Sequence, residues 1–302
     1  MPVLDHKIDF ALVFTVRNAN PNGDPLDDNR PRTTYTGQGE VSDVCLKRKI
    51  RNRWMDEGYS VFVQSDDRRT DAFRSLRDRA DACPALKECL AAIQAQKRKK
   101  EKAAVTREDY ARSACAQWLD VRAFGQVFAF KQGKKGEDDT DGVSVGVRGP
   151  VSIQSAFSLD VVTVTSTQIT KSVNLKTDRD DPDKKGSDTM GMKHRVDYGV
   201  YTTFGSINVQ PASTTGFSGE DALALKEALR TLFRNDATSA RPDGSMEVVK
   251  LVWWEHDCKN GQYSAAKVHR SLRVRAEPGQ VPEVTVDETA IPGLRYELIE
   301  GE

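Results

Sequence analysis

A run of alternating apolar residues near the start of the chain constrains the fold more than any other feature. Between residues 8 and 16 every second residue is apolar, and this alternation places one face of a strand against a core. Residues 17–25 are rich in Asn, Pro, Gly and Asp, which favour turns and interrupt both helices and strands. The sequence therefore predicts a first strand over residues 8–16 and a loop that continues through residue 39.

A helix is predicted over residues 43–55. Ser42 is suited to cap its N-terminus, apolar residues recur every four positions from Leu46 to Trp54, and Gly58 follows its end. Within this segment five basic residues occur without an acidic one: Lys47, Arg48, Lys49, Arg51 and Arg53. Such a cluster indicates either a polyanionic partner or a solvated helix face, and the run alone favours neither.

Two excursions interrupt the rest of the pattern. Residues 66–110 are highly charged with helical apolar spacing, which predicts an inserted helical subdomain, and residues 121–130 are strand-like or mixed. Residues 151–167 and 196–209 are β-prone and flank a polar, charged segment. They therefore predict a strand pair with a long excursion between its arms.

The last elements complete a recognisable order. Ser218 and Asp221 have the spacing of a capping box that starts a helix, and the apolar residues 248–254 predict a strand. Without its excursions the chain runs strand, helix, strand, strand, helix, strand, which is the order of α+β ferredoxin-like folds and RNA-recognition modules. In such folds two helices cover one face of an antiparallel sheet and the other face is free to bind, most often nucleic acid. The same topology also serves enzymes and small-molecule sensors, so it does not determine the function.

Composition excludes several classes of protein. Lys plus Arg equals Asp plus Glu at 45 each, and the five cysteines include no CxxC pair, so neither a disulfide framework nor a zinc site is expected. P-loop and HExxH patterns are absent from the sequence, and no stretch is apolar enough to cross a bilayer. We therefore expect a cytoplasmic protein with no metal, no cofactor and no membrane partner. Residues after Arg275 are strongly acidic, and a disordered, solvated tail is the simplest account of them.

Several long phrases strongly resemble the backbone subunit of type I CRISPR Cascade complexes, the Cas seven family, and specifically its type I-C (Csd-two) branch. These phrases are FTVRNANPNGDPLDDNRPR (residues 14–32), GQGEVSDVCLKRKIRNRW (37–54), DVRAFGQVFAF (120–130), GVRGPVSIQSAFS (146–158) and TMGMKHRVDYGVY (189–201). The resemblance runs from the first strand to about residue 235. It implies a protein that polymerises head to tail along CRISPR RNA together with other Cascade subunits, and that presents the guide to target DNA.

The resemblance also implies a hand-shaped subunit with a ferredoxin-like, RNA-recognition palm. The expected parts are a palm of residues 1–55, 119–164 and 196–260, helical fingers of residues 56–118, a thumb of residues 165–195, and a C-terminal extension of residues 261–302 with an acidic tail. A subunit that coats any guide sequence is expected to contact phosphates and sugars and to leave the base edges free.

By the same resemblance we expect specific residues to meet the RNA. Phosphate contacts are assigned to Lys47, Lys49 and Arg51, and sugar or backbone contacts to Arg17, Asn18, Asn20 and Asn22. Arg122, Phe124 and Gln126 are candidates for stacking or sugar contacts, although Phe124 also suits a core. Lys193 and His194 lie where the thumb rejoins the palm. Met190 and Met192 are candidate wedges between nucleotides, and packing under the thumb is the equal alternative for both.

An enzyme is the rival hypothesis. Backbone subunits of type III effectors resemble this fold and cut RNA with an aspartate after the first strand, where this chain has Asp24, Asp27 and Asp28, which are suited to hold magnesium. However, Asp24 lies within NPNGDP, a phrase typical of the non-cutting type I branch. We therefore expect no catalysis. A ferredoxin-like oligomeric scaffold without nucleic acid is the third alternative.

Overall fold

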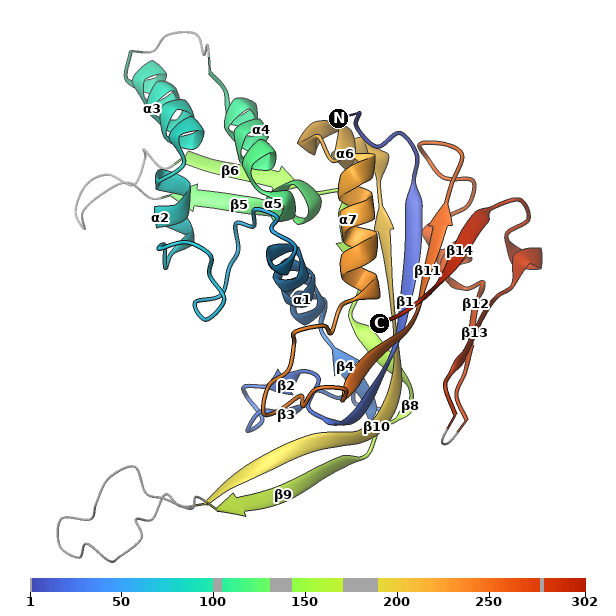
Figure 1. Cartoon of the computed structure of the whole chain (residues 1–302). Helices are drawn as coiled ribbons and strands as arrows, with labels where there is room; N and C mark the ends of the chain where they lie inside the picture. The colour runs from blue at the N-terminus through green and yellow to red at the C-terminus, as the bar shows by residue number, and fades with distance from the viewer. Residues whose placement is uncertain (1, 100–104, 131–142, 171–189, 278–279) are drawn as a thin grey trace, which may run out of the picture.

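The computed structural model describes residues 2–99, 105–130, 143–170, 190–277 and 280–302 (Figure 1). Its centre is an antiparallel sheet in the order β14-β11-β1-β10-β8-β4. These strands are β14 (Arg295–Glu300), β11 (Met246–Glu255), β1 (Ile8–Ala19), β10 (Met190–Ile207), β8 (Ala156–Val161) and β4 (Gln38–Val41). Two shorter pairings add β7 (Val151–Ile153) and β9 (Val164–Thr170) to β10.

The predicted alternation in β1 is confirmed, and it continues to Ala19. Phe10, Leu12 and Phe14 belong to the large core on one face of the sheet, which contains α1 (Asp43–Asp56) and α7 (Gly219–Arg230). The intervening Ala11 and Val13 are equally buried, in a separate core on the other face. β1 is therefore a central strand with apolar cover on both sides.

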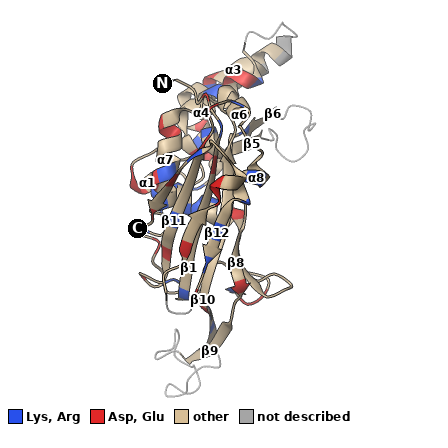
Figure 2. Ribbon diagram, turned by 90° about the vertical axis from the view of Figure 1, so that its right-hand side faces the viewer, with Lys and Arg blue, Asp and Glu red and all other residues tan. Residues whose placement is uncertain are grey.

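The expectation that the second face is free is wrong for this part of the sheet. The C-terminal extension covers it with α8 (Ala265–His269), β12 (Leu272–Arg275), β13 (Glu283–Val286) and the 3₁₀ turn η2 (Glu288–Ala290) (Figures 1 and 2). Val268, Val284 and Leu294 are buried against the strand residues Val252 and Trp254. These side chains form a second hydrophobic core between the extension and the sheet.

The acidic end of the chain is ordered, contrary to the expectation of a solvated tail. β14 forms the outer strand beside β11, with Leu298 opposite Val252 in the register. Its carboxylates are matched by cations, since Glu297 accepts two hydrogen bonds of 2.8 Å from the ammonium of Lys226. Backbone pairing and these ion pairs hold the acidic segment on the sheet.

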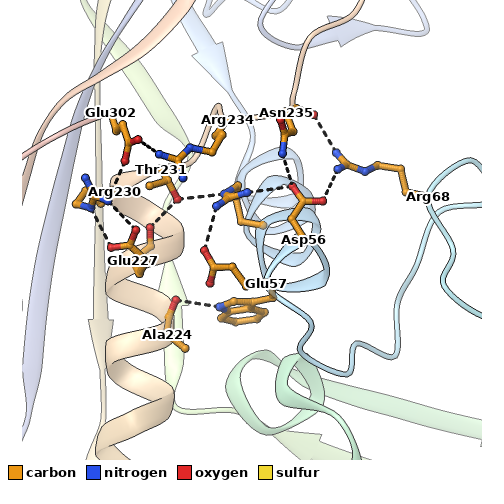
Figure 3. Close-up of polar contacts among 12 residues, drawn as sticks. Asp56, Glu57, Arg68, Ala224, Glu227, Arg230, Thr231, Arg234, Asn235 and Glu302 are labelled. Carbon is orange, nitrogen blue, oxygen red and sulfur yellow. Dashed lines mark hydrogen bonds and ion pairs between the residues drawn. The ribbon is translucent and has the colours of Figure 1, made fainter.

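Both predicted helix caps are confirmed. The Ser42 hydroxyl accepts a 3.2 Å hydrogen bond from the Cys45 amide at the start of α1, and Ser218 and Asp221 form a complete capping box at the start of α7. The two helices are joined by the indole of Trp54, whose Nε1 donates to the carbonyl of Ala224 over 3.1 Å (Figure 3).

A buried guanidinium strengthens the same junction. Arg53 of α1 is 4% exposed, and it donates to the Thr231 hydroxyl over 3.1 Å at the end of α7. Its other nitrogens pair with Asp56 and Glu57 at 3.0 Å, and Asp56 in turn accepts from Arg68 of the finger region (Figure 3). One arginine thus links α1, α7 and the entry to the fingers.

The finger region has a core separate from that of the sheet. It contains α2 (Leu76–Asp81), α3 (Pro84–Lys99) and α4 (Arg107–Gln117), as predicted for a helical insertion, together with the hairpin β5 (Gly125–Phe130) and β6 (Val143–Arg148). Phe62 packs in this core between Trp118 and Phe128. Its ring centroid lies 4.6 Å from that of Trp118 and 5.2 Å from that of Phe128. The β5–β6 hairpin, expected in the palm, therefore packs with the fingers.

Residues 121–130 divide between two elements, in agreement with their mixed pattern. α5 (Leu119–Phe124) ends at Gly125, which has a φ of +80° and begins β5. A side chain at Gly125 would meet the carbonyl oxygen of Val147 at 2.3 Å. Glycine is therefore required where the helix turns into the hairpin.

β9 and the first half of β10 form a two-stranded ribbon that extends beyond the sheet (Figure 1). Met190 pairs with Thr170 at its far end and Val196 with Val164 at its base. The predicted strand pair of residues 151–167 and 196–209 is present as β7 and β8 beside β10. The ribbon extends this pairing into the expected thumb, and residues 171–189 of that thumb lie outside the described residues. None of the helices in the described part of the chain is long and apolar enough to span a bilayer.

Candidate nucleic-acid interface

The loop after β1 is shaped by two of the predicted asparagines. Asn20 is 4% exposed and donates from Nδ2 to the carbonyl of Asn29 over 2.6 Å. Asn22 accepts two hydrogen bonds at Oδ1, from the backbone N–H of Ser42 at 3.0 Å and from its hydroxyl at 2.9 Å. A small hairpin follows Asn22 and pairs β2 (Gly23–Asp24) with β3 (Arg30–Pro31). These amides hold the loop against the N-terminus of α1.

The end of β1 presents two of the predicted residues to solvent. Arg17 is exposed, and its guanidinium carbon lies 5.0 Å from the ring centroid of Tyr198 on the neighbouring strand. Asn18 is also exposed and has a φ of +52°, a left-handed conformation that asparagine tolerates better than most residues. Stacking on Tyr198 orients a cation at the surface where β1 meets the loop.

The five cations of α1 have partners within the chain. Lys49 pairs with Asp236, Arg51 with Asp120 at 2.8 Å, Lys47 with Asp43 at 2.9 Å and Arg53 with Asp56 and Glu57, while Arg48 donates to the carbonyl of Val63 over 2.8 Å. Two of these carboxylates, Asp120 and Asp236, come from distant segments, and the other three lie at or next to the ends of α1. This arrangement accounts for the cluster without an external polyanion.

Burial separates these cations into two groups. Side-chain exposure is 3% for Lys49 and 12% for Arg51, whereas it is 27% for Lys47. Burial lowers the pKa of Lys49, and the adjacent carboxylate of Asp236 opposes this effect. Lys47 is thus the most accessible of the three cations expected to contact phosphate.

Phe124 lies between these groups and has an aromatic partner. Its ring stacks on Trp54 with centroids 5.3 Å apart, and the Arg51 guanidinium and the Lys47 ammonium lie 5.1 and 6.0 Å from its centroid. The side chain is partly buried, in agreement with the core alternative, and it packs against the main core. The ring of Phe124 therefore forms cation–π contacts with Lys47 and Arg51 of α1.

Arg122 and Gln126 form hydrogen bonds within the chain. Arg122 forms a bidentate pair with Asp221, at 2.9 and 2.7 Å, and donates from Nη1 to the carbonyl of Cys115. This guanidinium joins α5 to the capped start of α7. The Gln126 amide donates to the carbonyl of Val127 over 3.0 Å.

The ribbon carries an exposed apolar pair. Met190 and Met192 are 62% and 55% exposed, and they share a ribbon face with His194 because every second residue of a strand points to the same side. Lys193 is exposed on the opposite face. His194 is 8% exposed and its Nδ1 lies 2.8 Å from the Ser166 hydroxyl. The two methionines are thus free of core packing among the described residues, and His194 is not.

The three loop aspartates interact with their own hairpin. Asp24 accepts hydrogen bonds from Arg32 at 3.3 Å and from the Leu26 amide at 3.1 Å, and Asp27 lies 3.8 Å from Arg30. Asp28 is exposed in a left-handed conformation. Among the described residues no group of three acidic, histidine or cysteine side chains is placed to hold a metal ion.

Two basic residues near this surface were missed from the sequence. The segment 235–245 lies against the end of β1. There the backbone N–H of Asn20 donates to the carbonyl of Ala240 over 2.9 Å, and the backbone N–H of Arg17 donates to the carbonyl of Ser245 over 2.8 Å. It brings Arg241 beside Asp236 at 3.0 Å, next to Lys49. Arg32, from the β3 end of the hairpin, faces Asp24. No periodicity marks either arginine, because both lie in irregular segments.

Comparison with known proteins identifies the family. The family model for CRISPR-associated protein Cas7 matches residues 6–291. The chain belongs to the Cas7 family. A curated relative, CRISPR-associated protein Cas7 of Haloferax volcanii, is 25% identical over 304 residues, which cover 95% of this chain and 82% of the relative.

Two solved structures described as CRISPR RNA-guided surveillance complexes contain chains similar to this Cas7 family member, at 16% identity each. One, in a pre-nicking complex, has a TM-score of 0.44 and covers 82% of this chain and 75% of its own. The other has a TM-score of 0.39 and covers 82% and 68%.

Proposed function

We propose that this chain is a backbone subunit of a CRISPR RNA-guided surveillance complex of the type I-C branch. It binds the guide RNA through phosphates and sugars and leaves the bases to pair with target DNA. The observation that carries the proposal is the Cas7 family match, which spans residues 6–291 and thus the palm, the fingers and most of the C-terminal extension. The phrases of residues 14–32 and 37–54 support the I-C branch.

The sheet supports an RNA-recognition-like palm. Its strands β11, β1, β10 and β8 are antiparallel neighbours, and α1 and α7 share the core on one face. This is the order that a strand-helix-strand-strand-helix-strand chain adopts in ferredoxin-like folds. Because the C-terminal extension occupies the opposite face, the guide binds at the end of β1 and along the ribbon instead of on the open sheet.

The predicted contacts divide into direct and positioning residues. Arg17, Asn18, Lys47 and Lys193 are exposed or partly exposed, so their polar groups meet phosphate or sugar directly. Asn20 and Asn22 shape the loop that carries these groups. Lys49, Arg51 and Arg122 act by holding α1 and α5 in place, because contact with RNA would require breaking buried ion pairs.

The ribbon supplies the contact between subunits. Exposed Met190 and Met192 are flexible, apolar side chains that insert between nucleotides. The thumb of residues 165–195, of which 171–189 lie outside the described residues, contacts the next copy. A head-to-tail contact of this kind generates an open helix whose length follows the RNA. The subunit itself does not cut nucleic acid, and two of its three loop aspartates, Asp27 and Asp24, pair with Arg30 and Arg32.

Co-expression with a CRISPR array tests the proposal. The purified protein is expected to absorb more strongly at 260 than at 280 nm, to protect the array transcript from added nuclease, and to form filaments in micrographs. A variant in which a short Gly/Ser link replaces residues 172–188 is the matched test of the thumb. Full-length, RNA-filled filaments from this variant would show that the segment is only a surface loop, and protein free of nucleic acid would overturn the proposed function.

A further inference from the structure

A second basic surface lies at the opposite end of the molecule from the β2–β3 hairpin and the ribbon. It is a groove of about 1380 Å³ between the fingers and the palm, and its walls are α4 and β6 on one side and α6 (Val209–Thr215) on the other. These three elements are found in the upper part of Figure 1. Residues 259–260, after β11, close one part of it. None of the residues assigned to guide binding lines this groove.

The groove has an excess of positive charge. Arg107, Arg112, Arg148 and Lys259 line it, against the single carboxylate of Glu108. Arg112 is paired with Asp109, whereas the other three cations are exposed and form no ion pair with a described carboxylate. This differs from α1, where the chain neutralises nearly every cation. Unpaired cations gathered around one groove concentrate a positive potential.

Size and chemistry indicate a polymer as the ligand. Small-molecule sites usually measure about 300–1,000 Å³ and are lined by apolar and aromatic groups. This groove is larger, and its described lining residues include no aromatic side chain. Exposed neutral donors, among them Asn208, Gln210 and Thr214, lie along α6 in the other wall. In nucleic-acid complexes, phosphates and sugars are contacted by arginine and lysine together with side-chain amides and hydroxyls.

The geometry points to a second nucleic-acid site in this groove, one that binds the sugar-phosphate backbone of a strand without reading its sequence. An acidic protein segment is less well suited, because protein interfaces rely on large aromatic anchors, and the described lining of the groove includes no aromatic side chain. Lack of a stacking platform predicts weak, strongly salt-dependent binding. The site does not depend on the proposed guide interface.

The test compares two triple variants of the full chain. Arg107→Gln, Arg148→Gln and Lys259→Gln remove the unpaired groove cations, and Arg270→Gln, Arg275→Gln and Arg295→Gln remove as many exposed cations from the C-terminal extension. Binding of a fluorescent mixed-sequence single-stranded DNA is measured from 50 to 200 mM salt. The groove variant is expected to lose about 2 from the slope of log K against log salt, at about 0.7 per phosphate contact. The control variant keeps the slope of the unchanged protein.

Two further arms make the outcome decisive. In the background of Arg17→Gln, Lys47→Gln and Lys193→Gln, the loss from the groove variant is expected to remain the same, because independent sites add. Failure of the guide interface alone would therefore leave this result intact. Equal slopes for the groove and control variants would overturn the proposal. A groove-dependent preference for polyglutamate over DNA would also overturn it and assign the groove to an acidic protein.

Discussion

The ammonium group of Lys49, on α1, forms a buried ion pair with the carboxylate of Asp236, 187 residues further along the chain. Asp236 also accepts from Arg241 at 3.0 Å, so one carboxylate joins α1 to the segment that lies against the end of β1. The Lys49 side chain is only 3% exposed and has no room to exchange this partner for water.

Removing the two partners of this pair is expected to have unequal effects. Asp236→Asn leaves the buried ammonium of Lys49 without an anion and should lower the free energy of unfolding by about 3 kcal/mol. Lys49→Met should cost less, because Asp236 keeps Arg241 as its partner. Urea unfolding measures both, with Lys47→Met as an exposed control that should change stability by less than about 1 kcal/mol. A larger loss in Lys49→Met than in Asp236→Asn would contradict this assignment.

Arg53 should be among the most sensitive cations for stability. Arg53→Gln removes the buried guanidinium that bonds Asp56, Glu57 and Thr231, so a loss of about 3 kcal/mol is expected (Figure 3). Arg230→Gln breaks more exposed pairs, with Glu227 and Glu302, and should cost less than about 1 kcal/mol. Thermal unfolding of the two variants separates them, and equal midpoints would disprove the central role of Arg53.

RNA affinity is expected to depend on the exposed cations and not on the buried ones. Arg17→Gln, Lys47→Gln and Lys193→Gln together should reduce the slope of log K against log salt for single-stranded RNA by about 2, and leave the fold intact. Fluorescence anisotropy over a salt series provides the measurement. The matched control is the triple variant of Arg270, Arg275 and Arg295, and a slope change in that control equal to the one in the test variant would refute the interface.

Acidification should weaken the attachment of the C-terminal extension. Burial lowers the pKa of His269 from its ordinary value of 6.5, and its Nε2 donates to the carbonyl of Gly205 over 3.2 Å. Because the unfolded chain takes up this proton first, stability is complete above pH 6.5 and falls as the pH drops through that value. The urea midpoint should therefore decrease between pH 7.5 and 5.5, and the decrease should be smaller in His269→Gln. The variant at pH 8 measures the cost of altered packing alone, and parallel pH profiles would exclude this histidine as the cause.

Further acidification should reach Asp9, beside the same histidine. Burial raises the pKa of Asp9, but hydrogen bonds from His256, Ser206 and Lys7 outweigh this effect and lower it below the ordinary value of 3.8. Its contribution to stability is therefore present above pH 3.8 and is lost as the pH falls below that value. Asp9→Asn should be destabilised at pH 7 by about 3 kcal/mol, since the buried Lys7 loses its anion. The difference from the unchanged protein should shrink in denaturant titrations at pH 3, and a constant difference would be incompatible with this role.

No metal-dependent cleavage is expected from the purified chain. Asp24 is engaged with Arg32 and with the Leu26 amide, so it orders the hairpin after β1. Labelled RNA and DNA incubated with magnesium or manganese should remain intact. Cleavage that disappears in Asp24→Asn would reverse the assignment, whereas cleavage that persists in this variant would indicate a contaminating nuclease.

Local patterns in the amino-acid sequence were enough to predict most of the central elements and the family resemblance. Alternation in residues 8–16 defined β1, the Ser42 and Ser218 caps defined the starts of α1 and α7, and the order of elements indicated the antiparallel sheet. These features are local, because the burial of a strand or helix face leaves a period of 2 or 3.6 residues in the chain itself. The long phrases added the family, which the match over residues 6–291 bears out.

The accessibility of these residues could not be predicted from such patterns, because it depends on contacts made in the folded chain. Five basic residues in α1 look alike in the sequence, yet Asp120 and Asp236 bind two of them from 69 and 187 residues away. In the same way, the C-terminal extension covers the sheet face that the topology alone would leave open. Ion pairing and burial depend on which distant segments come into contact in the folded chain, and these contacts cannot be predicted from the spacing of residues along the sequence.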